Sequence, residues 1–105
     1  MELSLSQAQA IYEQAEAHKE IIQEVLLERV RQDNKFGPQN RPPFEWKIIL
    51  DEEVGEVSHE VCEVYFRGEE FSDKYRKELV EVAAVALAAL QNYDQRAAAA
   101  SSSNS

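Results

Sequence analysis

The 105 residues suffice for one domain of roughly three or four helices, but such a chain is near the lower limit for burying a large core alone, so self-association is expected. Its 20 acidic and 11 basic residues give a formal net charge of -9, which argues against a protein that holds nucleic acid by non-specific phosphate contacts. An anionic ligand would need a metal bridge.

The single cysteine, Cys62, cannot form an internal disulfide and is expected to be a small core residue in a reducing compartment. Residues 1–4 lack the basic and apolar regions of a signal peptide, and no apolar run is long enough to span a bilayer. These features predict a cytoplasmic protein without membrane contact.

The first helix is predicted from Ser4 to about Asn34, and His18 is a position where it can break. Ser4 and Gln7 have the spacing of a capping box. Apolar or small residues follow at helical spacing: Ala8, Ile11, Ala15, Ile22, Val25, Leu26 and Val30. Gly37 and Pro38 then stop the helix. Phe36 does not fit the helical spacing of the core-facing residues, so it either packs back on the helices or forms a wall of a binding site.

The second helix is predicted from Pro42-Pro43 to about Arg67, because proline is tolerated in a first helical turn and Gly68 favours a stop. One face is apolar and consists of Leu50, Val54, Val57, Val61, Val64 and Tyr65. Another stripe consists of Trp46, Glu53, Glu56, Glu60 and Glu63. The helix is therefore apolar on one side and mostly acidic on another.

The third helix is predicted from a cap at Ser72 or Asp73 through Asn92 or beyond. Between Leu79 and Leu90 every residue is apolar except Glu81, so this segment should be buried on most sides and points to a partner chain. We therefore expect an all-α bundle of three main helices, completed by oligomerisation. Residues 1–96 form the single domain, and residues 97–105 form a low-complexity, flexible tail that extends the helix briefly, then frays and has no function of its own.

Two pairs of glutamates dominate the chemistry that the sequence predicts. At about 100° per residue, Glu53 and Glu56 lie on one helix face, and Glu78 and Glu81 lie on one face of the next helix. A short connection favours antiparallel packing, which would bring both pairs together. Four such carboxylates repel one another unless a divalent cation neutralises them, and oxygen ligands suit Mg²⁺ or Mn²⁺ rather than zinc.

Most glutamates at helical spacing simply form a solvated face, and Glu52, Glu60 and Glu63 are assigned to such a face. Glu81 is different, because exposing it would also expose part of the most apolar segment. Gly55 is also unusual, since a glycine inside a helix costs about 1 kcal/mol relative to alanine. Its presence suggests a close approach of backbone or ligand between Glu53 and Glu56, unless it is there by chance.

These motifs resemble those of a known superfamily. Glu52-Glu53-x-x-Glu56 followed by Glu78-x-x-Glu81 is similar to the EExxE and ExxD motifs of the MazG-like all-α nucleoside triphosphate pyrophosphohydrolases. The similarity extends over roughly residues 25–90, including the Arg31-Gln32-Asp33-Asn34-Lys35-Phe36-Gly37 and Tyr75-Arg76-Lys77-Glu78-Leu79 runs. One position departs from the family pattern, because Glu81 stands where the family usually has Asp.

The resemblance implies hydrolysis of a nucleoside triphosphate between the α and β phosphates, which gives a monophosphate and pyrophosphate and serves nucleotide-pool house-cleaning. It implies Mg²⁺ held by Glu53, Glu56, Glu78 and Glu81. A carboxylate, Glu53 in preference to its neighbour Glu52, would orient the attacking water or take its proton. The longer side chain of Glu81 would shift the ion or change the number of ions.

Three further residues are candidates by position. Lys74 and Lys77 precede Glu78 and Glu81 at helical spacing, so they either bind the β and γ phosphates or form the ion pairs Lys74–Glu78 and Lys77–Glu81. Trp46 lies two turns before Glu53, roughly 10 Å along the helix, and either stacks on the base or belongs to the core.

Two rival functions remain. Glu56 and His59 form a Glu-x-x-His pattern of the kind found in di-iron carboxylate bundles, but a second copy of it would have to come from another chain. A non-catalytic helical interaction module is the other rival, and it predicts that removing divalent metal does not change the behaviour of the protein. The sequence favours the Mg²⁺-dependent pyrophosphohydrolase, acting as a homodimer or homotetramer on a nucleotide whose base it does not specify.

Overall fold

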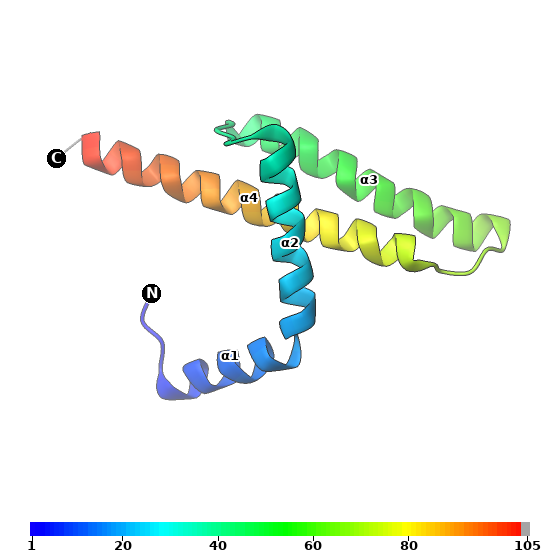
Figure 1. The fold of residues 1–105 in the computed structure, drawn as a ribbon, viewed down its shortest axis with the longest axis horizontal. Helices are drawn as coiled ribbons and strands as arrows, with labels where there is room; N and C mark the ends of the chain where they lie inside the picture. Colours follow the sequence, from blue (N-terminus) through cyan, green and yellow to red (C-terminus); the bar gives the residue numbers. More distant parts are fainter. Residues whose placement is uncertain (104–105) are drawn as a thin grey trace.

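The computed structural model describes residues 1–103, and all regular secondary structure in this range is helical. Its helices are α1 (Leu5–Ala17), α2 (Lys19–Phe36), α3 (Pro43–Arg67) and α4 (Asp73–Ser103) (Figure 1). The predicted all-α class is confirmed. The predicted first helix is divided into α1 and α2, so this range holds four helices where three main helices were expected.

The division falls at His18, whose φ of -117° and ψ of 20° interrupt the helical path. α1 begins with the predicted capping box, in which the Gln7 backbone N–H donates to Ser4 Oγ at 3.1 Å and the Ser4 N–H donates to Gln7 Oε1 at 2.9 Å. α1 contacts α2 alone and contains no buried residue. It therefore projects from the rest of the molecule (Figure 1).

The other helix boundaries follow from glycine and proline. Gly37, at φ 72°, ends α2 and donates its N–H to the Asp33 carbonyl at 2.8 Å. α3 starts and ends where predicted, at Pro43 and before a left-handed Gly68. α4 continues through the predicted tail as far as Ser103, so no helix ends at the expected domain boundary, and residues 104–105 lie outside the described range.

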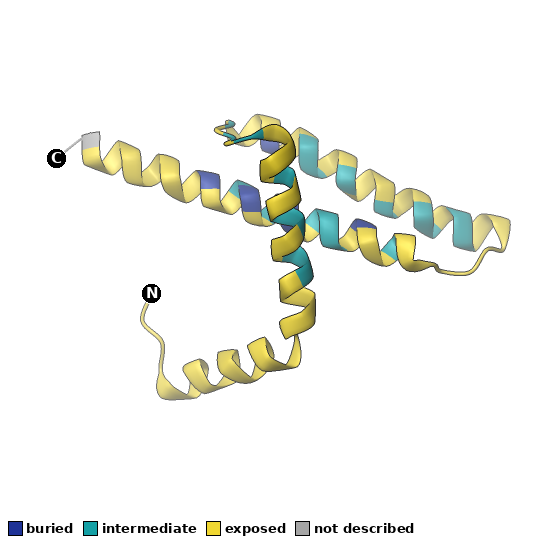
Figure 2. Ribbon diagram, viewed as in Figure 1, coloured by how far each residue is buried: buried dark blue, intermediate teal, exposed yellow. Residues whose placement is uncertain are grey.

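α4 is the centre of the fold, because it packs against both α3 and α2. α3 and α4 form an antiparallel hairpin, and α2 crosses α4 (Figure 1). The core between these helices is small and consists of Trp46, Ala84, Val85 and Ala88. Figure 2 shows the covered positions on the facing sides of α2, α3 and α4, whereas α1 is exposed throughout.

One expectation about burial is corrected. Cys62 is exposed, because it lies on the side of α3 that faces away from α4 and is not part of the core. The apolar segment of α4 buries Ala84, Val85 and Ala88, whereas Leu79, Leu87 and Leu90 are exposed in the single chain, so burial of this segment on most sides would require the expected partner chain. Within residues 1–103, no helix combines the length and apolar character needed to cross a membrane.

Candidate metal centre

The antiparallel hairpin brings together the four glutamates that the sequence singled out. Glu53 and Glu56 come from the middle of α3, and Glu78 and Glu81 come from the first turns of α4. One carboxylate oxygen of each residue lies within 4.8 Å of an oxygen of every other. The i,i+3 spacing places each pair on the inner face of its helix, and the short connection of residues 68–72 sets the two faces opposite each other.

These carboxylates differ in how far they are covered. Glu78 is buried, Glu53 and Glu81 are half-buried, and Glu56 is exposed at the mouth of the site. The Oε2 atoms of Glu53 and Glu78 are both buried without a hydrogen-bond partner among the described protein atoms. A buried anionic oxygen without a donor is costly, so these two atoms are strong candidates for contact with a cation.

Burial and the crowding of carboxyl groups raise the pKa of three of the four glutamates. For Glu53 burial is the largest cause of the raised pKa; contact with Glu81 comes second and lowers it, and the charges of Glu56, Glu78 and Glu28 raise it further. The pKa of Glu81 is raised first by burial, although its contact with Glu78 acts in the opposite direction. For Glu56, contact with the Glu78 carboxyl is the largest cause of the raised pKa.

A cavity of about 380 Å³ opens over the carboxylates, and its far wall is α2. That wall consists of Glu28, Arg31, Gln32, Lys35 and Phe36. Sequence reasoning assigned no role to the first four and left the role of Phe36 open. Their spacing was the available signal, because residues 28, 31, 32 and 35 share one helix face. The cavity therefore has an acidic floor and a wall that carries an aromatic ring, the cation of Lys35, and Arg31 paired with the Glu28 carboxylate at 3.6 Å.

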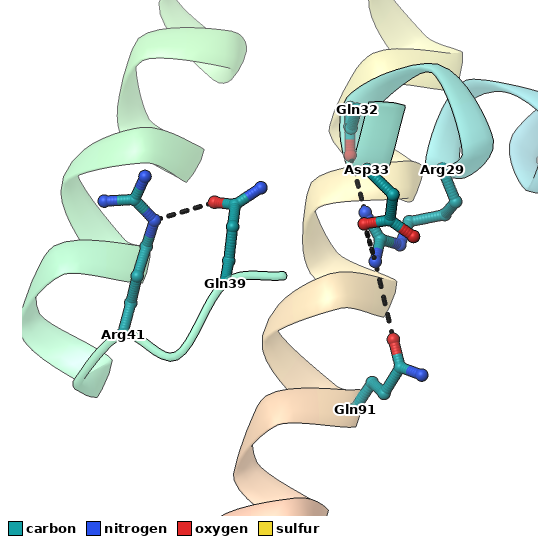
Figure 3. Close-up of polar contacts among 6 residues, drawn as sticks. All are labelled: Arg29, Gln32, Asp33, Gln39, Arg41 and Gln91. Atoms are coloured by element: carbon teal, nitrogen blue, oxygen red, sulfur yellow. Dashed lines mark hydrogen bonds and ion pairs between the residues drawn. The ribbon is translucent and has the colours of Figure 1, made fainter. Parts of the chain in front are cut away.

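Two sets of polar contacts hold α2 in this position. Arg29 donates to Gln32 Oε1 at 3.1 Å, to Asp33 Oδ1 at 3.0 Å and across to Gln91 Oε1 of α4 at 3.4 Å (Figure 3). Arg76 of α4 also pairs with Glu24 of α2. Because Gln32 itself lines the cavity, the Arg29 contacts connect the packing of α2 on α4 directly to the site.

Lys74 and Lys77, the predicted phosphate-binding residues, lie outside the lining of this cavity. Lys74 pairs with Glu60 across the hairpin, Nζ to Oε1 at 3.2 Å, rather than with Glu78. That contact raises the pKa of Lys74, and the charges of Glu78 and Glu56 raise it further, so its ammonium group lies at the edge of the acidic cluster. No ion pair joins Lys77 to any residue of the described range, including Glu81.

Trp46 lies away from the carboxylates, in the core at the other end of the hairpin. Its side chain is only 7 % exposed, and its Nε1–H donates to Asn92 Oδ1 at 2.8 Å. Trp46 does not line the acidic cavity, whereas Phe36 does. The burial of Trp46 therefore agrees with the alternative that it belongs to the core.

The remaining acidic stripe of α3 is less solvated than predicted. The side chains of Glu60 and Glu63 are 15 % and 18 % exposed, because Lys74 pairs with Glu60 while His59 and Arg67 approach Glu63. Glu52 is exposed as expected. His59 faces Glu63 at 3.7 Å and lies outside the carboxylate cluster, which leaves the di-iron alternative without a histidine ligand in this chain.

Gly55 makes no close contact, which corrects the expectation of a nearby backbone. Apart from the two chain neighbours and the backbone of its own helix, no described protein atom lies within 4 Å of a Cβ built at this position. The reason is that Gly55 is on the exposed side of α3, opposite the face that meets α4. Of the explanations that the sequence left open for this glycine, a ligand and chance remain.

The donor set fits a hard divalent cation. Four carboxylates offer oxygen atoms alone, and the two buried oxygens without a partner belong to two members of the cluster, Glu53 and Glu78. Oxygen-only coordination is typical of Mg²⁺ and Mn²⁺. A cation held by Glu53, Glu56, Glu78 and Glu81 would remove the repulsion that raises the pKa values of Glu53, Glu56 and Glu81.

No protein-family model matches this chain, and no curated protein or solved structure matches it. The functional interpretation therefore rests on the geometry of the site and on the residue pattern of the chain.

Proposed function

We propose that this protein is a Mg²⁺-dependent nucleoside triphosphate pyrophosphohydrolase of the MazG-like kind, which converts a nucleoside triphosphate to a monophosphate and pyrophosphate. One observation carries the proposal: the four carboxylates at the positions of the superfamily motifs, with Glu81 in place of the usual Asp, converge within 4.8 Å, and two of their oxygens are buried without a donor among the described protein atoms. We further propose nucleotide-pool house-cleaning as its role, in the cytoplasm, as a homodimer or homotetramer.

A bound divalent cation would supply Lewis-acid chemistry here, by screening the triphosphate charge and polarising the α phosphoryl group. Glu53, Glu56, Glu78 and Glu81 would hold Mg²⁺, with Mn²⁺ as a substitute. Without such a cation, a chain of net charge -9 with this acidic floor would repel a triphosphate rather than bind it.

Glu53 is the favoured proton acceptor. In the proposed reaction, an oxygen of water attacks the α phosphorus, the bond from that phosphorus to the bridging oxygen breaks, and pyrophosphate leaves. Glu53 lines the cavity, so its carboxylate can reach the attacking water and accept its proton. Glu52, the alternative, is exposed and does not line the cavity.

The α2 wall supplies complementary contacts for the rest of the substrate. Arg31 and Lys35 lie opposite the carboxylates as candidates for the β and γ phosphates. Arg31 is already paired with Glu28 at 3.6 Å, so Lys35 is the cation of this wall without an ion pair in the described range. Phe36 offers an aromatic face to a base, and Lys35 Nζ already lies 5.1 Å from the centre of that ring. Lys74, at the edge of the cluster, remains a candidate for the same phosphates, whereas Lys77 and Trp46 gain no support from their positions.

A non-catalytic helical interaction module is the second candidate, favoured by the exposed apolar residues of α2 and α4. Leu26, Val30, Leu87 and Leu90 line a groove of about 820 Å³ between these helices. Such a surface fits a partner helix. This candidate leaves the convergence of four carboxylates without a purpose, and so we rank it second.

The test is incubation of the purified protein with a panel of ribonucleoside and deoxyribonucleoside triphosphates, with and without Mg²⁺, followed by separation of the products. The proposal predicts equal amounts of monophosphate and pyrophosphate from at least one substrate, only when divalent cation is present. Release of orthophosphate, or no turnover with any substrate, contradicts it and favours the interaction module.

A further inference from the structure

α1 is an amphipathic helix without a surface to cover its apolar face. Leu5, Ala8, Tyr12 and Ala15 lie on one side at helical spacing, and Ile11 lies beside them. All are exposed, and α1 touches only α2. Isolated helices shorter than about 12 to 15 residues are marginal in water. A 13-residue helix in this position therefore gains from docking against another apolar surface.

The charge of α1 is entirely negative. Glu13 and Glu16 are its only charged residues, and both lie on one flank of the apolar face, at about 100° per residue. Glu13 accepts a hydrogen bond from Gln9, and neither carboxylate forms an ion pair within the described range. A surface that binds α1 should thus be apolar at its centre and basic at its rim.

The groove between the start of α3 and the second half of α4 has this chemistry. Its volume is about 560 Å³. Its apolar lining consists of Pro43, Trp46, Leu50, Ala89, Tyr93 and Ala97. Its charged residues are Arg41, Lys47 and Arg96, and no carboxylate lines it. The lining spans roughly 11 Å of α3 and 12 Å of α4, which is enough for about two turns of a docked helix.

Two of the three cations at this rim have neutral partners alone. Arg41 Nε donates to Gln39 Oε1 at 2.7 Å (Figure 3), and Arg96 Nε donates to Asn40 Oδ1 at 2.8 Å. Neither guanidinium meets a carboxylate of residues 1–103, in a chain where acidic residues outnumber basic ones by 20 to 11. Lys47 is paired with the exposed Asp51 at 2.6 Å.

The larger apolar groove between α2 and α4 is less suited to α1. Its charged residues are Arg29, Asp33 and Asp94, and Arg29 is already bound to Asp33. An acidic helix would meet net negative charge there, which disfavours binding. Charge thus selects the α3–α4 groove over the larger one.

From this complementarity we infer that α1 of one chain docks in the α3–α4 groove of a second copy. Within one chain, α1 lies apart from this groove, at the far end of α2 (Figure 1). Each chain has one free helix and one free groove, so reciprocal exchange closes a two-fold dimer. The apolar face of α1 covers Tyr93 and Leu50, and Glu13 and Glu16 meet Arg41 and Arg96.

Charge reversal tests this interface in the full chain by sedimentation. The wild-type protein should be a dimer or a multiple of it. The variant Glu13→Lys/Glu16→Lys and the variant Arg41→Glu/Arg96→Glu should each dissociate, with the dimer weakened at least about tenfold because like charges then face each other. An equimolar mixture of the two should reassemble, since each α1 again meets a groove of opposite charge. A matched control, Glu69→Lys/Glu70→Lys in the α3–α4 connection, carries the same charge change and should leave assembly unaltered.

A monomeric wild-type protein overturns the inference. It is also overturned if either charge-reversed variant assembles to the same molecular mass as the wild-type protein. A mixture that fails to reassemble also overturns it, because exchange between copies requires the rescue. Circular dichroism shows whether each variant keeps its helices. If Arg41→Glu disturbs the α2–α3 connection, Lys47→Glu/Arg96→Glu replaces it with the same expected result. The readout is molecular mass, so its outcome is independent of whether the protein hydrolyses nucleotides.

Discussion

Asn92 and Glu78 are buried polar side chains of the same helix, yet their surroundings differ. Asn92 is 4 % exposed and its Oδ1 accepts from Trp46 Nε1 and from the Arg41 backbone N–H, while its Nδ2 donates to Asn40. Glu78 is 7 % exposed, and its Oε2 has no donor among the described protein atoms. One end of the α3–α4 hairpin thus satisfies its polar groups, and the other does not.

This difference separates what holds the fold from what is available to a ligand. At the Asn92 end, hydrogen bonds offset the cost of burial and tie the α2–α3 connection to α3 and α4. At the Glu78 end, burial and repulsion raise carboxyl pKa values and destabilise the metal-free protein. A structure tolerates such a cost at functional sites, where a ligand removes it. Substitutions at the two ends should accordingly affect different properties.

The largest expected effect is that of Glu56→Gln on turnover. Glu56 is exposed at the mouth of the cavity, so the substitution leaves packing unchanged while it removes one of four anionic ligands. We expect kcat/KM to fall by about 10³-fold, comparable to the loss of a key electrostatic group in other active sites. The free energy of unfolding measured with urea in the absence of metal should not fall.

The neighbouring Glu52→Gln is the matched control, since Glu52 is exposed on the same helix and does not line the cavity. Its kcat/KM should stay near that of the unsubstituted protein. Equal losses in both variants would show that the bulk charge of α3, rather than the cluster, supports turnover.

Asn92→Ala should produce the largest loss of stability. It leaves the indole N–H of Trp46 and the backbone N–H of Arg41 without their acceptor in a buried site. We expect a cost of about 2 to 4 kcal/mol in the free energy of unfolding, because each stranded donor costs about 1 to 3 kcal/mol. Urea denaturation measures it, and exposed Asn34→Ala serves as control with a change under about 0.5 kcal/mol. A small effect at Asn92 would remove the distinction between the two ends.

Sequence patterns were sufficient for the all-α class, for several helix boundaries and for the acidic floor of the site. Helix boundaries at Ser4, Pro43 and Gly68 follow from local chemistry that acts within a few residues, and the convergence of Glu53, Glu56, Glu78 and Glu81 follows from a three-residue spacing plus one short connection. Such features depend on neighbours along the chain and on one antiparallel contact.

What the sequence did not predict depends on contacts between distant segments. The crossing of α2 over α4 brings Arg31 and Lys35 opposite the carboxylates, and helix periodicity alone does not define that crossing. Trp46 shares a helix face with Glu53, but it lies two turns away, in the core, where it donates a hydrogen bond to Asn92. Lys74 pairs across the hairpin with Glu60, which an analysis within one helix cannot reveal. Cys62 is exposed because α3 buries only the face that meets α4.

The stabilising effect of Mg²⁺ should depend on pH. The pKa values of Glu53, Glu56 and Glu81 are raised above their ordinary value of 4.5, so the metal-free folded state keeps protons that the unfolded chain has released. Stability from these groups is therefore greatest below about pH 4.5 and decreases as pH rises through the raised pKa values. Mg²⁺ replaces the protons, and its effect should grow with pH over the same range.

Thermal unfolding at pH 5 and pH 7.5, each with and without Mg²⁺, measures this linkage. At an Mg²⁺ concentration of about 100 times Kd, we expect about 2 to 3 kcal/mol of stabilisation at the higher pH and less at the lower. Asn92→Ala should show the same Mg²⁺ increment as the unsubstituted protein. A cation site at this cluster would be contradicted if stability rises with pH in the absence of metal, or if Mg²⁺ leaves stability unchanged at both pH values.

The smallest expected effect distinguishes the two ends as binding sites for the triphosphate. Lys35→Ala removes an exposed cation of the α2 wall and should raise KM about fivefold with little change in kcat, since one exposed charge contact is worth about 1 kcal/mol or less. Lys19→Ala, at the exposed start of the same helix and outside the cavity, is the matched control and should leave KM unchanged.

Trp46→Phe removes the hydrogen bond to Asn92 and should lower the free energy of unfolding by about 1 kcal/mol without changing KM. If KM responds to Trp46→Phe and not to Lys35→Ala, the base and phosphates bind toward the Asn92 end, and the α2 wall is not part of the site.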